Sequence, residues 1–467
     1  MKKSPRIHTH SILKDLRLES RFESLLGALS SNLNATVPQS TGTRASSKAA
    51  YRFWDNEQLT PEMLLAYHMS KVSNMHFGKA GKKRFLQLSD STELDYTKHR
   101  CAPALGPLNY QRQRGLLLHN SLLINDVGCP VGLLKQSFII RTPESFGQSV
   151  ERCKSALLSD KETWRWCEHF EAGQSLCQQD PDLEIVFVAD READFMELLV
   201  RRTEPNMHFI VRSQHDRKLS SGVSKLSAAL AAQAPQGCYT LQVMDPKTRK
   251  MRRACLQVCA CPVTLKLHKA APQRKNLPPL HVFALDVQEI TAGIDAQEAI
   301  HWRLLTSLPA DSLEDILQIV QYYVWRWLIE RFHFLLKSGG AEVEKLQLAT
   351  RKRLLNAIST YSIAAMDAFK LKYLAEKQPD TPIYEVGISP LQHQVLYTYA
   401  QQKVDPKIQF KPDEPPTVRE YCILLGRIAG FFPSKRQPIP GLIILSRALE
   451  KFNFLVDAYL IFCQRTE

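Results

Sequence analysis

Residues 184–213, EIVFVADREADFMELLVRRTEPNMHFIVRS, contain the pattern on which the expected fold depends. An apolar run at 184–190 ends in an aspartate, a helical segment follows at 193–202, and a second apolar run lies at 208–213. Continuous apolar runs of this length are typical of strands that are buried on both faces of a sheet. The stretch therefore predicts a strand, a helix and a strand within an α/β core.

Three further strands are expected before this unit. The run at 84–90 also ends in an aspartate, and the runs at 115–125 and 131–141 form a predicted hairpin across DVGCP. A helical pattern at 160–173 then leads to the strand at 184–190. Three strands, a helix, a strand, a helix and a strand predict an α/β fold with a mixed sheet.

Residues 214–300 interrupt this core with strand-like segments, which predicts a β-rich insertion. Within 247–275 there are nine lysines and arginines and no acidic residue. Such a charge run forms either a solvated face or a surface that contacts phosphates, and the absence of acids favours the phosphate contact.

A long helical pattern follows at 311–340, after one more strand at 301–307. Asp311 or Ser312 can cap its first turn, and Gly339–Gly340 is a natural stop, so we expect one continuous helix. From about 345 to the end the apolar periodicity stays helical, interrupted by a Pro-rich linker at 406–420.

The N-terminal part is expected to be a short helical module. Apolar residues at helical spacing span 12–35, and a polar link with Arg44, Lys48 and Arg52 follows, close to three aromatic residues. Cations interleaved with aromatics suit a DNA backbone, and they suit a small core equally well.

Length and charge bound the function. A chain of 467 residues predicts two or three domains, because single domains usually hold about 100–200 residues. The 61 lysines and arginines exceed the 47 aspartates and glutamates, and the net charge of +14 favours an anionic partner, with nucleic acid ahead of a membrane surface or an acidic protein. Without an apolar run of ~18–20 residues or a signal-peptide pattern, we expect a cytoplasmic protein with no membrane contact.

Eleven cysteines are scattered along the chain, which is typical of reduced thiols rather than of a disulfide scaffold. Cys255, Cys259 and Cys261 would share one face of a strand, because their separations are even. A zinc site there is the alternative to three packed thiols, but no second CxxC or paired histidine supports it.

The helix at 311–340 has a polar stripe. Tyr323, Arg326, Glu330 and Lys337 are spaced at i, i+3, i+7 and i+14, so they fall within an arc of about 60°. A carboxylate between two cations suits a face on which the cations hold DNA phosphates and the carboxylate meets a metal ion. A solvated, salt-bridged stripe is the alternative.

Two strand ends add carboxylates to this stripe. Asp90 and Asp190 end separate strands, where polar groups converge on a site in α/β proteins. Together with Glu330 they supply the hard oxygen ligands that Mg²⁺ or Mn²⁺ prefers. Two ions held in this way serve in-line attack on a phosphodiester.

These residues lie in motifs that resemble a known family. DREAD stands at 190–194, the stripe completes a Y-x2-R-x3-E-x6-K pattern, and further likeness covers SDST at 89–92, FIVRS at 209–213 and WRLLTS at 302–307. Likeness also covers KAAYRF near the N-terminus and LGRIAGFFPSKR near the C-terminus. The chain resembles the bacterial cut-and-paste DDE transposases of the insertion-sequence-four family, the group that includes the transposon-five transposase.

The resemblance implies a ribonuclease-H-like catalytic core with a β-rich insertion, flanked by N-terminal and C-terminal α-helical domains. On this basis we expect an N-terminal DNA-binding domain at 1–68, the catalytic domain at 69–370 with the basic insertion at about 214–300, and a helical dimerisation domain at 371–467. The C-terminal helices here are aliphatic and Phe-rich where the family often has Trp-rich ones, so the dimer contacts do not transfer residue by residue.

The resemblance also implies roles for single residues. Asp90, Asp190 and Glu330 correspond to catalytic metal ligands for two Mg²⁺ ions, with Mn²⁺ as a substitute. The DNA contacts would come from the rest of the stripe, a strand arginine and a tryptophan that stacks on a flipped base: Tyr323, Arg326, Lys337, Arg212 and Trp302. A lone tryptophan on a strand more often belongs to the core; the family context favours stacking.

The implied reaction is cut-and-paste transposition of an insertion sequence. A dimer would bind the terminal inverted repeats of double-stranded DNA, nick one strand, form and reopen a hairpin, and join the end to target DNA. Two other functions remain open: a nuclease or resolvase on the same type of core, and a regulator that binds the ends without cutting. A pure binder has no need of three metal carboxylates, which favours an enzyme.

Overall fold

A computed structural model describes residues 12–463, apart from residues 14, 78–80, 111, 143–160, 221–222, 246, 249, 267–278, 292 and 295–297. Its strands are β1 (Lys83–Asp95), β2 (Gly106–Pro107), β3 (Arg114–Asn125), β4 (Pro130–Ile139), β5 (Leu183–Ala189), β6 (Met207–Arg212), β7 (Gly237–Met244), β8 (Met251–Leu265), β9 (Leu280–Glu289) and β10 (His301–Thr306). Over the described ranges they form one mixed sheet in the order β2–β3–β1–β5–β6–β10–β9–β8–β7, with β4 also paired to β3.

The expected α/β core with a mixed sheet is confirmed. β1, β5 and β6 are parallel neighbours, and β3 is antiparallel to both β1 and β4. The helix α6 (Trp164–Gln179) connects β4 to β5, and the short helix α7 (Met196–Leu199) lies between β5 and β6. The element order is therefore the predicted one, although α7 is much shorter than the helix expected at 193–202.

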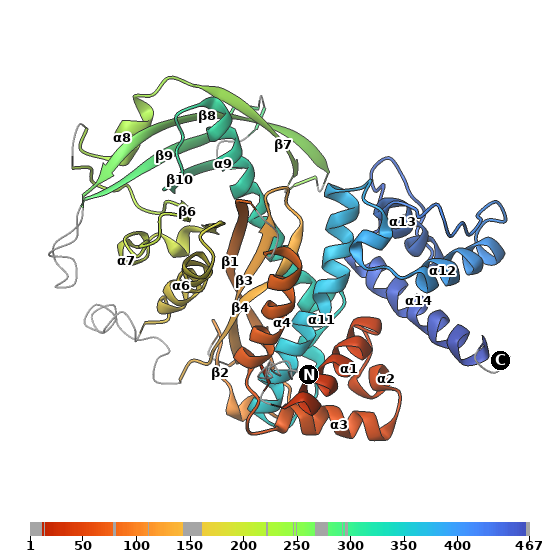
Figure 1. The fold of residues 1–467 in the computed structure, drawn as a ribbon. Coiled ribbons are helices and arrows are strands. Elements are labelled where there is room, and N and C mark those ends of the chain that lie inside the picture. The colour runs from red at the N-terminus through yellow and green to blue at the C-terminus, as the bar shows by residue number, and fades with distance from the viewer. Residues whose placement is uncertain are drawn as a thin grey trace, which may run out of the picture.

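The insertion continues the core sheet instead of forming a separate one. The strands expected within 214–300 are present as β7, β8 and β9, and a short helix, α8 (Leu226–Ala231), precedes them. β10 pairs with β6 on one side and with β9 on the other, so the insertion strands extend the core sheet away from β4 (Figure 1).

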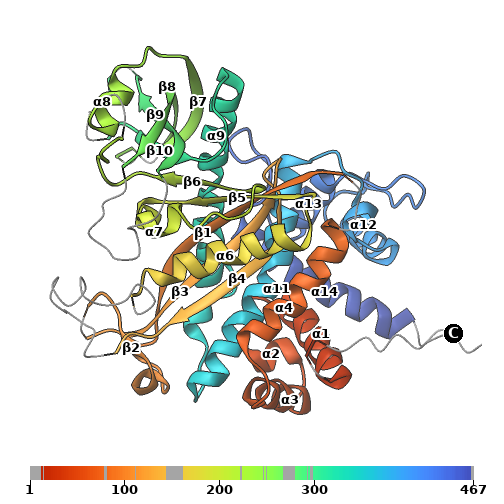
Figure 2. The ribbon, with the colours of Figure 1, turned by 60° about the vertical axis from the view of Figure 1, so that its left-hand side comes forward.

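Helices cover both faces of the core strands. Along β5, Val186 and Val188 belong to one buried cluster, whereas Ile185 and Phe187 belong to another. Because successive side chains point to opposite faces, these are the two faces of the sheet. The face of Ile185 is covered by α6 and α7, and the face of Val186 is covered by the helices of residues 313–377 (Figure 2).

The single long helix expected at 311–340 is wrong in detail. Ser312 caps α9 (Leu313–Trp325) through a capping box with Asp315, and α10 (Trp327–Phe334) follows after an interruption at Arg326. The last turn then widens into a π-helical segment, η6 (Leu335–Gly339). At the interruption the N–H of Arg326 bonds to the carbonyl of Tyr323 at 3.1 Å, an i to i+3 bond that replaces the usual one.

The N-terminal module is helical, as expected, and it is joined to the rest by a common core. Its helices are α1 (Leu16–Ser31), α2 (Val37–Thr41), α3 (Arg44–Asp55) and α4 (Pro61–His76). The polar run that we expected to be a link contains α2 and α3, because Thr36 and Thr43 cap them. The boundary expected at residue 68 lies inside α4, whose residues contact β4 and the long helix α11 (Arg351–Lys377).

The C-terminal part is helical as predicted. α12 (Pro390–Lys403), α13 (Val418–Ile428) and α14 (Leu442–Cys463) pack with the end of α11 in a core of their own. The Pro-rich linker separates α12 from α13, and the boundary expected at residue 370 lies inside α11. Among the described helices, none combines the length and the apolar character that crossing a membrane requires.

The basic run at 247–275 is partly neutralised in three dimensions. Lys247 lies 2.7 Å from Glu298, and Arg252 pairs with Glu289. These acids come from β9 and from the segment after it, outside the run, so its sequence overstates its free positive charge. Four of the nine cations lie outside the described residues: Arg249, Lys269, Arg274 and Lys275.

Candidate active site

Asp90 and Asp190 lie level with each other where the pairing of β1 with β5 ends. The last pair of these two parallel strands is Leu88 with Val188. Asp90 is two residues beyond Leu88, and Asp190 directly follows β5. The register therefore brings the two predicted aspartates to the same edge of the pairing, as expected for a site in an α/β sheet.

β1 does not end at Asp90, contrary to the expectation. The strand continues to Asp95 because β3 pairs with it as far as Asp95 with Gly115. Beyond Leu88, β1 is thus hydrogen-bonded as a strand on its β3 side only. Asp90 lies in the part of β1 that has left β5, next to the end of β5 that Asp190 follows.

Arg326 connects the third carboxylate to this edge. Its guanidinium donates to Asp90 Oδ2 at 3.1 Å and to Glu330 Oε1 at 2.7 Å. The Arg326 side chain is only 10% exposed, so both contacts are shielded charge-assisted hydrogen bonds. The helix interruption at Arg326 thus occurs at the residue that bridges β1 and α10.

The charges of Asp190 and Glu330 both act on Asp90. Burial is the largest cause of a pKa of about 7 for Asp90. The Arg326 guanidinium lowers this pKa, whereas the charges of Asp190 and Glu330 raise it. A carboxylate whose ionisation is opposed by burial and by two neighbouring negative charges favours the binding of a cation.

Asp90 is expected to destabilise the metal-free protein at neutral and alkaline pH. Because its pKa is raised from 3.8 to about 7, Asp90 contributes to the stability of the folded protein below pH 3.8. This contribution is lost as the pH rises to about 7. We therefore expect Asp90→Asn to raise the melting temperature at pH 8 by about 1 °C, the shift that about 1 kcal/mol produces in a chain of 467 residues. Differential scanning fluorimetry in EDTA from pH 4 to 8 measures the melting temperatures of the variant and the parent. A difference between them that stays constant over this pH range would contradict the raised pKa of Asp90.

Tyr323 and Trp302 form a buried aromatic pair beside the carboxylates. Their ring centroids are 5.1 Å apart in an edge-to-face contact, and the residues are 2% and 8% exposed. Trp302 is therefore part of the core in this conformation. Arg212 donates to the carbonyl of His301 at 3.0 Å. Burial raises the pKa of Tyr323, while the charges of Arg326 and Arg212 lower it, so both arginines lie near its hydroxyl.

Lys337 faces β1 from the π-helical segment η6. Its Nζ donates to the carbonyl of Glu93 at 2.8 Å and lies 3.6 Å from Glu344 Oε1. The side chain is 34% exposed, so part of it is accessible from solvent. Arg326 and Lys337 both contact β1, so the predicted stripe faces the strand that carries Asp90. Lys337 also has an acidic partner, Glu344, which the sequence pattern did not indicate.

The donor set fits Mg²⁺ in its chemistry, since carboxylate oxygens are the ligands this ion prefers. Within the residues that the structure describes, no three histidine, cysteine, aspartate or glutamate side chains are close enough to hold a metal ion. Arg326 bridges Asp90 and Glu330 in this conformation. The absence of a metal-binding group among the described residues also covers Cys255, Cys259 and Cys261. These cysteines lie on β8, where Cys259 and Cys261 are buried.

Two residues of this region were not predicted from the sequence. Arg165 of α6 contacts the segments that follow both aspartates, and nothing in its local sequence marks it. Trp327 is 56% exposed, and its ring centroid lies 5.9 Å from the Arg326 guanidinium. Because Trp327 directly follows Arg326 in the motif, the sequence could have identified it as part of this region. His333, three residues after Glu330, is buried, and burial lowers its pKa to about 3.

Comparison with known proteins identifies similarity at the N-terminus. Residues 8–59 match a family described as transposase DNA-binding, and this range includes α1, α2 and α3. The N-terminal helices are therefore similar to the DNA-binding domain of transposases, which agrees with the expected DNA partner.

One solved structure is also similar over most of the chain. It is described as a cryo-EM structure of the piggyBac transposase synaptic complex with hairpin DNA. The similarity covers 94% of this chain and 80% of that chain, at 10% sequence identity and a TM-score of 0.35. A similarity of this degree supports no conclusion about fold or mechanism.

Proposed function

We propose that this protein is a DDE DNA transposase that moves an insertion sequence by a cut-and-paste reaction, and that it is a member of the insertion-sequence-four family. The observation that supports the proposal is that Arg326 bonds to both Asp90 and Glu330, at the edge of the β1–β5 pairing that Asp190 also follows. This site lies in a chain whose N-terminal helices resemble a transposase DNA-binding domain.

The architecture supports a ribonuclease-H-like core. The element order is three strands, a helix, a strand, a helix and a strand, and the β-rich insertion precedes the helix that bears Glu330. Two aspartates at neighbouring parallel strands and a helical glutamate are the arrangement that the resemblance implies. The nuclease and regulator alternatives share parts of this architecture, so the chemistry must separate them.

Asp90, Asp190 and Glu330 are the residues that would hold two Mg²⁺ or Mn²⁺ ions. Such ions, when bound, supply an activated water and stabilise the leaving 3′ oxygen. Arg326 would exchange its present bonds to Asp90 and Glu330 for a phosphate of the DNA. A guanidinium forms equivalent bidentate bonds with carboxylate and with phosphate, so the exchange conserves its hydrogen bonds.

Lys337 is expected to contact a DNA phosphate. We predict that Lys337→Ala weakens binding of DNA ends and makes the slope of log K against log salt shallower by about 1, the change expected when one phosphate contact is lost. Fluorescence anisotropy at several salt concentrations measures the slope. Lys345→Ala, which removes an exposed lysine paired with Glu342, is the matched control; equal slopes for Lys337→Ala and the unaltered protein would exclude the contact.

Trp302 is expected to stack on a DNA base that leaves the double helix during hairpin formation. Stacking of this kind is worth roughly 1–3 kcal/mol per base. Trp302→Phe preserves most of the buried contact with Tyr323, so we predict normal nicking and a hairpin yield reduced by about tenfold, equivalent to about 1.4 kcal/mol. Gel analysis of both products measures this, with Trp325→Phe as control. An undiminished hairpin yield would assign Trp302 to the core alone.

The proposal is tested with purified protein and DNA that carries the gene's own flanking sequences. We expect short inverted repeats at both borders, Mg²⁺-dependent cleavage at their ends and joining of those ends to a second DNA. Cleavage without joining would favour the nuclease or resolvase, and binding without cleavage would favour the regulator.

A further inference from the structure

Arg165 links the two segments that follow the candidate catalytic aspartates. Its Nε donates to Ser91 Oγ at 3.1 Å, and its second terminal nitrogen donates to Glu192 Oε2 at 2.6 Å. A third bond ties it to the carbonyl of Glu162 at 2.7 Å. The Arg165 side chain is 7% exposed and its partner Glu192 is 60% exposed, so the guanidinium is shielded while its acidic partner reaches solvent.

The two residues that Arg165 holds also orient the aspartates. The backbone N–H of Ser91 donates to Asp90 Oδ1 at 2.7 Å. The backbone N–H of Glu192 donates in the same way to Asp190 Oδ1 at 2.9 Å. Each carboxylate is therefore fixed by the residue whose side chain bonds to Arg165.

No strand pairing joins these two segments directly. The β1–β5 ladder ends at Leu88 with Val188, before either aspartate. Beyond it, Ser91 belongs to β1, which is paired with β3, whereas Glu192 belongs to a short 3-10 turn after β5. The guanidinium of Arg165 bonds to both segments and so connects them where the strand ladder does not.

We propose that Arg165 is a positioning residue that sets the separation of Asp90 and Asp190 for metal binding. The proposal rests on the function proposed above. Arg165 acts through Ser91 and Glu192 and is not placed in contact with substrate or metal.

The physical reason is the mutual repulsion of the carboxylates. Two like charges at one site tend to separate until a cation binds, and a side chain bonded to both segments opposes this movement. Arg165 is well suited to the task because its flat, five-donor group bonds in several directions at once. Its helix is held by the buried Trp166 and Phe170, both 0% exposed, so the cross-link is anchored in the core.

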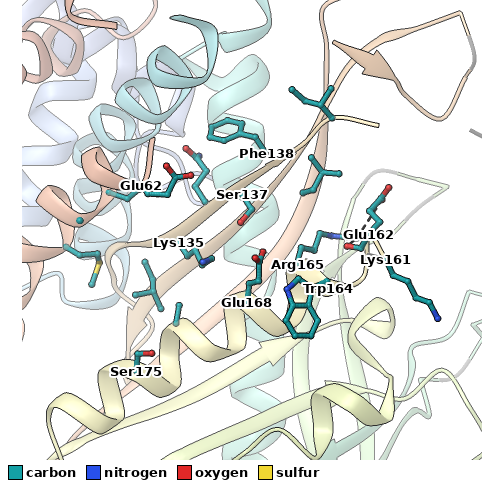
Figure 3. A pocket seen from close by; sticks show the side chains of 18 of the residues that line it. Glu62, Lys135, Ser137, Phe138, Lys161, Glu162, Trp164, Arg165, Glu168 and Ser175 are labelled. Carbon is teal, nitrogen blue, oxygen red and sulfur yellow. Dashed lines mark hydrogen bonds and ion pairs between the residues drawn. The ribbon is translucent and has the colours of Figure 1, made fainter. Parts of the chain in front are cut away.

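The surroundings of Arg165 allow it to be replaced without overpacking. It lines a cavity of about 950 Å³ between α4, β4 and α6, in which Figure 3 shows Arg165 beside Glu162 and Trp164. A methionine retains the apolar stem of the side chain and removes all of its donors. A lysine retains the charge but lacks the fixed fork of donors.

Mn²⁺ binding tests the proposal independently of activity. We expect Arg165→Met to weaken binding of Mn²⁺ by the full-length protein about 10–100-fold, the usual effect of removing a group that holds a ligand in place. Electron paramagnetic resonance of free Mn²⁺ measures the affinity. Arg165→Lys should recover part of the loss, and cleavage at saturating Mn²⁺ should fall less than the affinity does.

Two further sets of variants separate positioning from a general loss of stability. Arg201→Met removes another arginine that pairs with α6, through Glu171, and it should bind Mn²⁺ normally. Ser91→Ala and Glu192→Ala each remove one end of the link. Their effects on Mn²⁺ affinity should be less than additive when Arg165 is present and additive in the Arg165→Met background.

The outcomes distinguish this inference from the proposed function. If Asp190→Asn does not reduce Mn²⁺ binding, the metal site and the role of Arg165 are both overturned. If Asp190→Asn reduces binding but Arg165→Met retains the parent affinity, only the role of Arg165 is overturned. Equal losses in Arg165→Met and Arg201→Met would also overturn it, since they would reflect stability alone.

Discussion

Asp90→Asn is expected to reduce DNA strand cleavage by at least about 10³-fold, equivalent to about 4 kcal/mol. An amide has the shape of the carboxylate but no negative charge, so it removes one anionic ligand from the metal site proposed for Asp90, Asp190 and Glu330. Metal-assisted phosphodiester cleavage depends on this charge by several kcal/mol. Asp190→Asn and Glu330→Gln are expected to cause losses of the same order, while all three proteins still bind DNA ends.

The measurement is single-turnover cleavage of an end-labelled DNA fragment, with end binding followed in parallel by gel shift. Asp95→Asn provides the control, because Asp95 lies on the same strand and its Oδ1 accepts bonds from Thr97 that an amide oxygen can also accept. Cleavage at the parent rate by any of the three active-site variants would remove that residue from the proposed site.

The loss of activity should accompany a gain in stability for Asp90→Asn above neutral pH. The raised pKa of Asp90 means that the folded, metal-free protein accommodates its charge poorly. A residue that costs stability and is needed for activity is typical of functional sites. A variant that is inactive and also less stable would instead indicate that Asp90 is chiefly the partner of Arg326.

A double substitution on α14 is expected to weaken the dimer that the proposed function requires. Ile443, Phe454 and Ile461 are 38%, 71% and 54% exposed, and their spacing of 11 and 7 residues places them on one face of the helix. An exposed apolar stripe of this kind marks an interaction site, and we propose that a second copy of the chain covers it. Phe454→Asp with Ile461→Asp should raise the dimer dissociation constant at least about 100-fold, since each buried anchor is worth about 2 kcal/mol.

Sedimentation velocity of the full-length protein, with and without DNA ends, measures the association. Met75→Asp on α4 is the matched control, because Met75 is an isolated apolar residue that is 54% exposed. Nicking of a single end should survive in the α14 variant, whereas joining of paired ends should be lost. A parent-like dimer in this variant would assign the interface to another surface.

The element order was predictable because it depends on local patterns. The strands at 84–90, 115–125 and 184–190 are buried on both faces, and their apolar runs show it. The convergence of Asp90 with Asp190 was predictable for the same reason, since residues after neighbouring strands meet at one edge. The limits of β1 were not, because its last residues depend on pairing with β3.

Charge was the least predictable property. The basic run at 247–275 contains no acid, yet Lys247 and Arg252 are paired with Glu298 and Glu289. Lys337 likewise has Glu344 as a partner. A sequence shows which charges a segment carries, but only the folded chain shows which of them are neutralised by segments distant in sequence.

The sequence by itself determined the α/β core, the helical ends and the candidate carboxylates, because periodicity and motif spacing are properties of short segments. The tertiary structure alone decided that the insertion strands join the core sheet through β10, that Trp302 is buried against Tyr323, and that Arg326 bridges Asp90 and Glu330. It also placed Arg165 between two segments that lie 74 and 27 residues away along the chain. Such contacts depend on how helices pack across a sheet, and no local pattern encodes that packing.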